Sequence, residues 1–291
     1  MGVRTNVRDC SGVAQQTTFE PVTPHRRTRV HGRTLLAFWG HARHDGVVRT
    51  TDLGAGPPPP TVLEHLASAT RSLVRTVDSL TEEELRAPSL LPRWSRGHLV
   101  AHLALNAEGL TGVLRGVALG AAVPMYRSPE ARDSDIEELA TRDAATLRDR
   151  LLGSVTGLSD AIEVVPADGW TARAQRTPGN RATFAATDAP LMRLREVALH
   201  HADLDMPFTR ADWTPGVAEL LAESLTDRVR TPCTLHAHDL GRSWTAGGGD
   251  SVAPGPTVSG TAADLAWWLS GRGGGDGLET DSGELPRTGA W

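Results

Sequence analysis

Four long segments of this chain carry apolar residues at helical spacing, and this periodicity favours a mainly helical fold. Leucine, valine and isoleucine recur every three or four positions within residues 61–80, 95–117, 134–164 and 188–204. Each segment therefore predicts a helix with one face to bury against its neighbours. Four such helices joined by modest connections predict a four-helix bundle.

The ends of these segments carry recognisable signals. Ser95 is predicted to cap the second helix, and Asp188 with Pro190 is predicted to begin the fourth. Between residues 170 and 184 the helical period is lost, and Pro178-Gly179-Asn180 predicts a hairpin-like turn. The third and fourth helices are therefore expected to be joined through a short hairpin.

The sequence pattern changes after residue 212, where helices alternate with short strand-like pieces. The predicted helices are 215–229 and 261–270, the strand-like pieces are 234–238, 243–246 and 257–259, and a glycine-rich loose tail follows. These elements predict a small α/β domain of about 80 residues. The predicted fold class is thus α+β and mainly α, with the bundle over 59–210 and the small domain over 211–291.

Residues 1–58 are predicted to form a disordered extension. The first 50 residues show neither helical nor strand period, and they hold eight arginines against three acidic side chains. The proline run at 57–60 is expected to act as a stiff spacer before the bundle. A basic tail that contacts a partner is the alternative interpretation.

Charge and hydropathy exclude several classes of protein. The net charge is -5 although the first 50 residues are basic, so the rest of the chain is acidic and suits nucleic acid poorly. No run approaches the roughly 18 apolar residues of a membrane span, and no segment has the form of a signal peptide. The expected location is therefore the cytoplasm.

The two cysteines, Cys10 and Cys233, cannot make a disulfide scaffold for a chain of this size. No C-x-x-C motif is present, which excludes the common zinc and redox patterns built on that spacing. Thiol chemistry would have to use one protein cysteine or a thiol brought from outside.

Two pairs of side chains with metal-binding chemistry occur at a spacing of four residues. His98 and His102 lie on the second predicted helix, and Glu196 and His200 lie on the fourth. Groups at this spacing share one helix face, so Glu196 and His200 could bind one ion that a histidine from a facing helix completes. Imidazole and carboxylate suit Zn²⁺ and related divalent ions. Alternatively, these side chains are ordinary polar residues on the helix surface, or they form a hydrogen bond within each helix.

Four motifs resemble those of the mycothiol-dependent maleylpyruvate isomerase family. Residues 92–103 are similar to its W-[ST]-x-x-x-[LV]-x-x-H-L segment, and residues 193–204 to its R-x-x-E-V-x-x-H-x-x-D-L signature. Residues 125–133 resemble the loop before its third helix, and 267–272 its W-L-x-G-R ending. The resemblance covers about residues 60–291.

The resemblance implies a DinB-like metal-binding four-helix bundle followed by a small α/β domain. It places the metal ligands at His102, Glu196 and His200, and the functional arginine of the second domain at Arg272. It implies two cofactors, a divalent metal ion (Zn²⁺) and the low-molecular-weight thiol mycothiol. Three protein ligands would leave a coordination position open for that thiol.

The implied reaction is a cis-trans isomerisation. A thiolate would add reversibly to the double bond of maleylpyruvate, which permits rotation and gives fumarylpyruvate on elimination. Arg272 would pair with the carboxylates or the enolate oxygen, although a cation at a helix end is the alternative for this residue. A mycothiol S-transferase that acts on electrophiles, or a non-catalytic metal-binding bundle, is the alternative function.

Three further polar residues lie close to the implied ligands in the sequence. Asp203 is predicted to orient His200 or His201 from the next turn, with a salt bridge at the helix end as the alternative. His201 points about 100° away from His200, so it is not expected to be a ligand. His98 is more simply a core or surface histidine than a group that supports the ligands.

Overall fold

The computed structural model describes residues 1–2, 56–247 and 255–289. The predicted extension over 1–58 therefore lies almost entirely outside the described residues, as does Cys10. Within the described part of the chain, no helix combines the length and the hydrophobicity that crossing a membrane requires.

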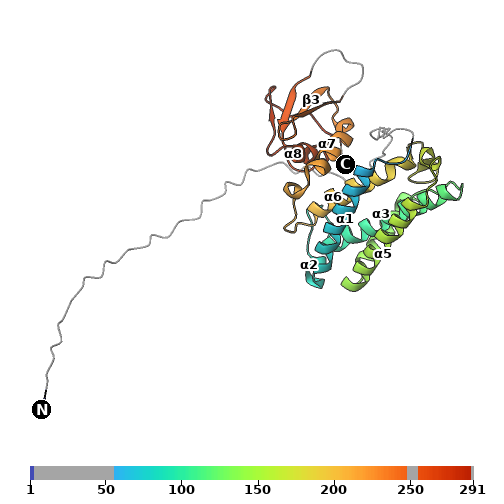
Figure 1. Ribbon diagram of the computed structural model, residues 1–291, viewed down its shortest axis with the longest axis horizontal. Coiled ribbons are helices and arrows are strands. Elements are labelled where there is room, and N and C mark those ends of the chain that lie inside the picture. Colours follow the sequence, from blue (N-terminus) through green and yellow to red (C-terminus); the bar gives the residue numbers. More distant parts are fainter. Residues whose placement is uncertain (3–55, 248–254, 290–291) are drawn as a thin grey trace. The chain divides into compact units, whose positions relative to one another are not determined.

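A four-helix bundle forms the first part of the fold, as the apolar periodicity predicts (Figure 1). Its helices are α1 (Pro60–Ser79), α3 (Arg96–Ala118), α5 (Ala144–Glu163) and α6 (Ala189–Asp203). The apolar positions of each helix face inward, and several of the leucines are completely buried. Burial of these apolar faces holds the helices together.

The prediction of one helix over 134–164 is wrong, because this segment divides in two. Helix α4 (Pro129–Ala140) begins earlier, where the Ser128 side chain caps it, and ends before α5 begins. Asp143 has an extended backbone, and its carboxylate accepts a hydrogen bond from the Thr146 N–H at 2.7 Å. That cap starts a new helix, which the unbroken apolar pattern does not reveal.

A short hairpin closes one end of the bundle at the predicted turn. Strands β1 (Arg173–Gln175) and β2 (Thr183–Ala185) pair antiparallel. Trp170 and Phe184 bury their rings there, in a separate apolar cluster with the C-terminal half of α3. The hairpin therefore covers the end of the bundle core.

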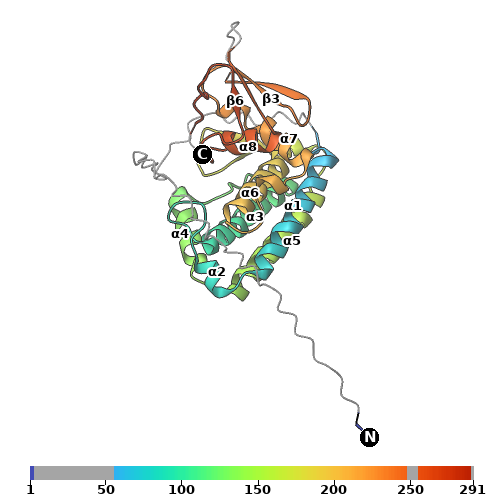
Figure 2. The same ribbon diagram turned by 90° about the vertical axis from the view of Figure 1, so that its left-hand side faces the viewer.

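The second part of the fold is a small sheet covered by two helices (Figure 2). Its elements are α7 (Pro215–Ser224), β3 (Cys233–Ala237), β4 (Arg242–Ala246), β5 (Thr257–Gly260), α8 (Ala262–Leu269) and β6 (Glu279–Thr280). The strand order is β4-β3-β5-β6, in which only β3 and β5 run parallel. Helix α8 packs on β3 and β5 and beside α7.

Two predictions for this part need correction. The helix expected over 215–229 ends at Ser224, after which Thr226–Arg228 form a 3₁₀ turn. The tail expected to be loose contains β6, which pairs with β5. A two-residue strand has no periodicity of its own and forms only because an edge strand lies beside it.

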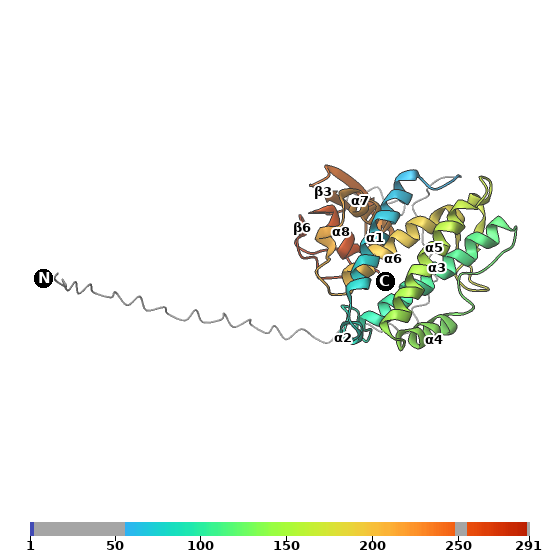
Figure 3. The same ribbon diagram turned by 60° about the horizontal axis from the view of Figure 1, so that its bottom comes forward.

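The C-terminal end of α6 is buried between the two parts (Figure 3). The Trp213 indole N–H donates to the Ala198 carbonyl of α6 at 3.2 Å. Arg96 at the start of α3 donates to the Leu204 carbonyl at 2.6 Å, immediately after α6 ends. One continuous apolar core runs through both parts, so the polar residues at this end of α6 are enclosed by protein.

His201 illustrates this enclosure. It points away from the neighbouring His200 toward α1, where its Nε2 lies 2.8 Å from the Thr76 hydroxyl oxygen. Its ring stacks on Phe208 with a centroid separation of 3.6 Å, and the residue is only 1% exposed. Burial lowers the pKa of His201 to about 4, so the folded protein holds this ring neutral at pH 7.

This depressed pKa predicts a defined acid sensitivity. The pKa in the unfolded chain is about 6.5, so the stability that neutral His201 contributes is complete above that pH and is lost toward pH 4. When the pH of metal-free protein falls from 7 to 5, the free energy of unfolding should decrease in both proteins. The decrease should be about 2 kcal/mol smaller in His201→Gln than in the wild type. Urea denaturation at both pH values measures this difference, and equal losses in the two proteins would contradict the assignment.

Candidate metal centre

Two buried histidines and a partly buried glutamate, all with metal-binding chemistry, meet between two helices. His102 comes from α3, and Glu196 and His200 come from successive turns of α6. The spacing of four residues puts Glu196 and His200 on one face of α6, and the apolar packing of the bundle presents that face to His102. No other group of three such residues converges in this way within the described ranges.

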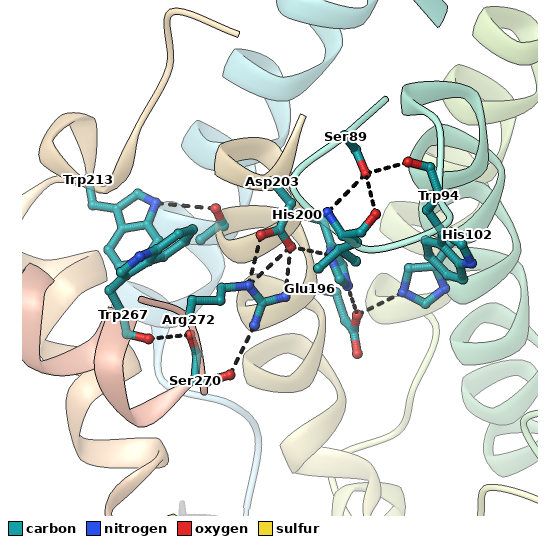
Figure 4. A network of polar contacts seen from close by, with 12 residues as sticks. Ser89, Trp94, His102, Glu196, His200, Asp203, Trp213, Trp267, Ser270 and Arg272 are labelled. Atoms are coloured by element: carbon teal, nitrogen blue, oxygen red, sulfur yellow. Dashed lines mark hydrogen bonds and ion pairs between the residues drawn. The ribbon is translucent and has the colours of Figure 1, made fainter. Parts of the chain in front are cut away.

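Both imidazoles direct their Nε2 atoms at one carboxylate oxygen. Glu196 Oε2 lies 2.9 Å from His102 Nε2 and 3.1 Å from His200 Nε2 (Figure 4). The two rings meet edge to face, with centroids 4.8 Å apart. One ligand atom from each of the three residues lies within 4.8 Å of the others, an arrangement that could hold a single cation.

Burial and hydrogen bonding set the charges at this centre. Burial lowers the pKa of His102 to about 4, so its imidazole is neutral near pH 7, as a metal ligand must be. Burial alone would raise the pKa of Glu196, but the hydrogen bonds from both histidines outweigh it and hold this pKa well below the ordinary value. Glu196 is therefore ionised.

The pKa of His200 shifts in the opposite direction to that of His102. Burial alone would lower its pKa, but hydrogen bonds to Asp203 and Glu196 outweigh burial and raise it. A proton on Nε2 compensates the charge of the two neighbouring carboxylates. A metal ion at the same place would do so as well, so a proton and a cation compete for this nitrogen.

Asp203 fixes the orientation of the His200 ring, as one of its predicted roles requires. Its Oδ2 accepts a hydrogen bond from His200 Nδ1 at 2.8 Å, and the carboxylate is completely buried. With its proton at Nδ1, His200 presents Nε2 to the centre. Contacts of this kind set the tautomer and increase the basicity of a ligating histidine.

Arg272 completes a line of paired groups that begins at His102. Its Nε and Nη2 atoms donate to the two Asp203 oxygens at 2.8 and 2.7 Å, in the forked geometry of a bidentate pair. Figure 4 shows Asp203 between Arg272 and His200, and Glu196 between His200 and His102. Arg272 therefore reaches the candidate ligands through Asp203.

The end of α8 explains this placement. Gly271 has a φ of 78°, and the N–H groups of Gly271 and Arg272 donate to the Trp268 and Trp267 carbonyls. This pattern is a Schellman motif, which ends the helix and turns the chain back on itself. The Arg272 guanidinium also donates to the Ser270 carbonyl at 3.2 Å, so it interacts with the helix end as well as with Asp203.

His98 is excluded from the ligand set by its contacts. Its Nδ1 accepts a hydrogen bond from the Ser95 N–H at 3.2 Å, while the Ser95 hydroxyl accepts one from the His98 N–H. This reciprocal pair is a capping box at the start of α3. The other ring nitrogen lies 3.2 Å from Glu137.

Two arginines near the centre have no role in the predictions made from the sequence. Arg132, in the first turn of α4, places Nη2 3.3 Å from His102 Nδ1. Arg193, three residues before Glu196 on α6, donates to the Leu103 carbonyl and the Asn106 side chain. The spacing of Arg193 from Glu196 is a signal that could have revealed it, whereas the position of Arg132 depends on a loop.

The remaining described cysteine is a poor nucleophile. Cys233 lies in β3, is 2% exposed and has no disulfide partner. Burial raises the pKa of its thiol, which disfavours the thiolate. Among the described residues, therefore, no cysteine offers a reactive thiol to this centre.

Two family models and two solved structures are similar to this chain. The family described as the mycothiol maleylpyruvate isomerase N-terminal domain matches residues 66–205, and the MDMPI C-terminal domain matches 214–290. Crystal structures of a mycothiol-dependent maleylpyruvate isomerase and of a histidine-to-alanine mutant are similar, each with a TM-score of 0.69 and 29% identity. Each comparison covers 79% of this chain and 96% of the other. No curated protein sequence matches significantly.

The pair formed by Arg272 and Asp203 makes a prediction about stability. Arg272→Ala removes the bidentate partner of a completely buried carboxylate, so the free energy of unfolding should fall by about 3 kcal/mol. The double variant Asp203→Asn with Arg272→Met removes both charges and should recover most of that loss. Denaturant unfolding of the single and double variants measures both effects, and a loss under about 1 kcal/mol for Arg272→Ala would show that the pair contributes little.

Proposed function

The chain belongs to the mycothiol-dependent maleylpyruvate isomerase family, and we propose that it is a mycothiol-dependent and metal-dependent cis-trans isomerase of the same type. The observation that carries this proposal is the convergence of His102, Glu196 and His200 in a chain that matches both domains of the family. We propose that residues 59–210 form the metal-binding domain and 211–291 the second domain. The proposed substrate is maleylpyruvate, converted to fumarylpyruvate.

The three converging residues fit a divalent metal ion, for which we propose Zn²⁺. Two imidazole nitrogens and one carboxylate oxygen are donors that zinc prefers. The low pKa of His102 and the ionised Glu196 mean that two of the three donors need no deprotonation near pH 7. Three protein ligands, rather than four, are typical of a catalytic site that also binds another molecule.

The chain's own residues prepare this site for chemistry. When bound, the cation lowers the pKa of a thiol that contacts it, which supplies a thiolate for reversible addition to a conjugated double bond. Asp203 keeps the His200 proton on Nδ1. Arg272 holds Asp203 in place, and we assign its guanidinium the catalytic role of stabilising negative charge on the substrate during addition.

The proposed partners of the protein are two small molecules, a thiol and a substrate. Cys233 is buried and its thiol pKa is raised, which supports a low-molecular-weight thiol as the nucleophile. The other partner is a small anionic substrate. The proposed location is the cytoplasm, where such a thiol stays reduced.

Metal content tests the ligand assignment. Protein prepared with zinc should contain about one ion per chain, and His102→Ala or His200→Ala should reduce this to near zero while most helical content remains. His98→Ala is the matched control, because it removes a histidine one turn away on α3 that caps the helix and pairs with Glu137 instead of facing the centre. Elemental analysis with circular dichroism gives both readouts, and one retained ion in both ligand variants would refute the assignment.

Thiol balance tests the reaction. A double variant, Cys10→Ser with Cys233→Ala, should still convert maleylpyruvate to fumarylpyruvate when mycothiol and zinc are supplied, and free mycothiol should stay constant during turnover. Product formation is followed by its absorbance and free thiol by titration. Loss of thiol in step with substrate would instead identify an S-transferase, and the absence of thiol-dependent turnover in the wild type would contradict the proposal.

A further inference from the structure

Three buried polar atoms near the metal centre have no hydrogen-bond partner within the described structure. They are the Tyr126 hydroxyl, Arg132 Nε and Arg193 Nη2. A buried donor without an acceptor costs free energy, so native proteins rarely retain one without a reason. Three such atoms around one centre therefore need a common explanation.

Arg132 contacts His102 directly, Tyr126 is linked to it through Arg132, and Arg193 contacts the next part of α3. Arg132 Nη2 lies 3.3 Å from His102 Nδ1, and the Arg132 guanidinium lies 5.8 Å from the centre of the Tyr126 ring. Arg193 donates to Asn106, which follows His102 by one turn of α3. Arg193 also precedes Glu196 by one turn of α6. The unpartnered atoms thus belong to residues that border the candidate ligands.

Local structure holds these side chains in position. The Tyr126 N–H donates to the Arg176 carbonyl at 2.8 Å, which ties the loop before α4 to the hairpin. The Ser128 cap then sets the start of α4, and Arg132 lies in its first turn. Arg193 is 1% exposed, and its Nη1 is held by the Leu103 carbonyl and by Asn106. Donors fixed in this way lose little freedom when a ligand binds.

The charge of this group favours an anion. Burial lowers the pKa of Arg193 to about 10, against the influence of Glu196 and Tyr126, so Arg193 is still protonated at pH 7. Arg132 pairs through Nη1 with the exposed Asp133, which leaves its buried Nε without an acceptor. The positive charge of these two guanidiniums and of a divalent cation together exceeds the single negative charge of Glu196. Oxygen atoms of a carboxylate are the acceptors that planar guanidinium groups bind best.

We propose that Tyr126, Arg132 and Arg193 bind a carboxylate group of the substrate beside the metal ion. The proposal rests on the function proposed above, in which the substrate carries a carboxylate at each end. Arg272 lies at the other end of the line from His102 to Asp203, so cationic groups stand at both ends of the site. A cation at His102 Nε2 also requires the imidazole proton at Nδ1, so Arg132 Nη2 then needs a new acceptor as well.

Maleate, a stable cis-dicarboxylate, tests this subsite without turnover. Calorimetry on zinc-loaded protein should show its Kd raised about tenfold in Tyr126→Phe, and at least as much in Arg132→Gln. Arg127→Gln is the matched control, because Arg127 lies in the same loop but is exposed and pairs with Asp135. Its Kd for maleate should equal that of the wild type.

Thermal unfolding separates ligand binding from a structural role. Without maleate, Tyr126→Phe should keep or raise the Tm, since it removes a buried hydroxyl that has no partner. In turnover, this variant should raise the KM for maleylpyruvate about tenfold and leave the KM for mycothiol unchanged. A lower Tm with unchanged maleate affinity would show that the hydroxyl serves the fold, and would overturn the proposal.

The remaining outcomes are equally decisive. If both Tyr126→Phe and Arg132→Gln keep zinc and bind maleate within twofold of the wild type, water alone satisfies these atoms and the proposal fails. If Arg132→Gln loses zinc, the maleate affinity of Tyr126→Phe alone decides whether the subsite exists. If the wild type binds maleate through these residues but shows no thiol-dependent turnover, the subsite stands and the proposed function fails. If the wild type does not bind maleate, the subsite is refuted.

Discussion

The structure depends on a buried line of paired groups that runs from His102 through Glu196, His200 and Asp203 to Arg272. Two carboxylates placed in a protein interior would be costly if either lacked a partner. Each is held here between donors on both sides. Because the line begins on α3, follows α6 and ends after α8, the second part of the fold must dock on α6 to complete it. The same docking brings Arg272 to Asp203, which contacts the candidate ligand His200.

Much of the fold follows from the sequence because helix packing is periodic. The apolar faces of α1, α3 and α6 have a repeat that only a bundle can bury, and these helices are found within about two residues of their predicted bounds. The division at Asp143 was missed because α4 and α5 both carry apolar residues, so one pattern runs on across the break. Strand β6 was missed for another reason. It exists only through pairing with β5, a contact that local sequence does not encode.

The residues of the candidate site likewise include some that the sequence predicts and some that it does not. The spacing of Glu196 and His200 is a local property of one helix, so their shared face is predictable. His102, which the family resemblance implied as the third ligand, lies opposite them across the bundle. The pair between Asp203 and Arg272 joins residues that no periodicity relates, and it depends on how the second part docks. Tyr126 and Arg132 reach the centre through a loop and a helix cap, whose course depends on backbone hydrogen bonds rather than on spacing.

The central claim is that one cation, bound by two imidazoles and a carboxylate, accepts an external thiol. X-ray absorption at the zinc edge, recorded on zinc-loaded protein before and after mycothiol is added, tests it most directly. The account predicts a first shell of nitrogen and oxygen alone before addition, and a new sulfur neighbour at about 2.3 Å afterwards. A spectrum that mycothiol leaves unchanged, or a sulfur neighbour already present without it, would contradict the account.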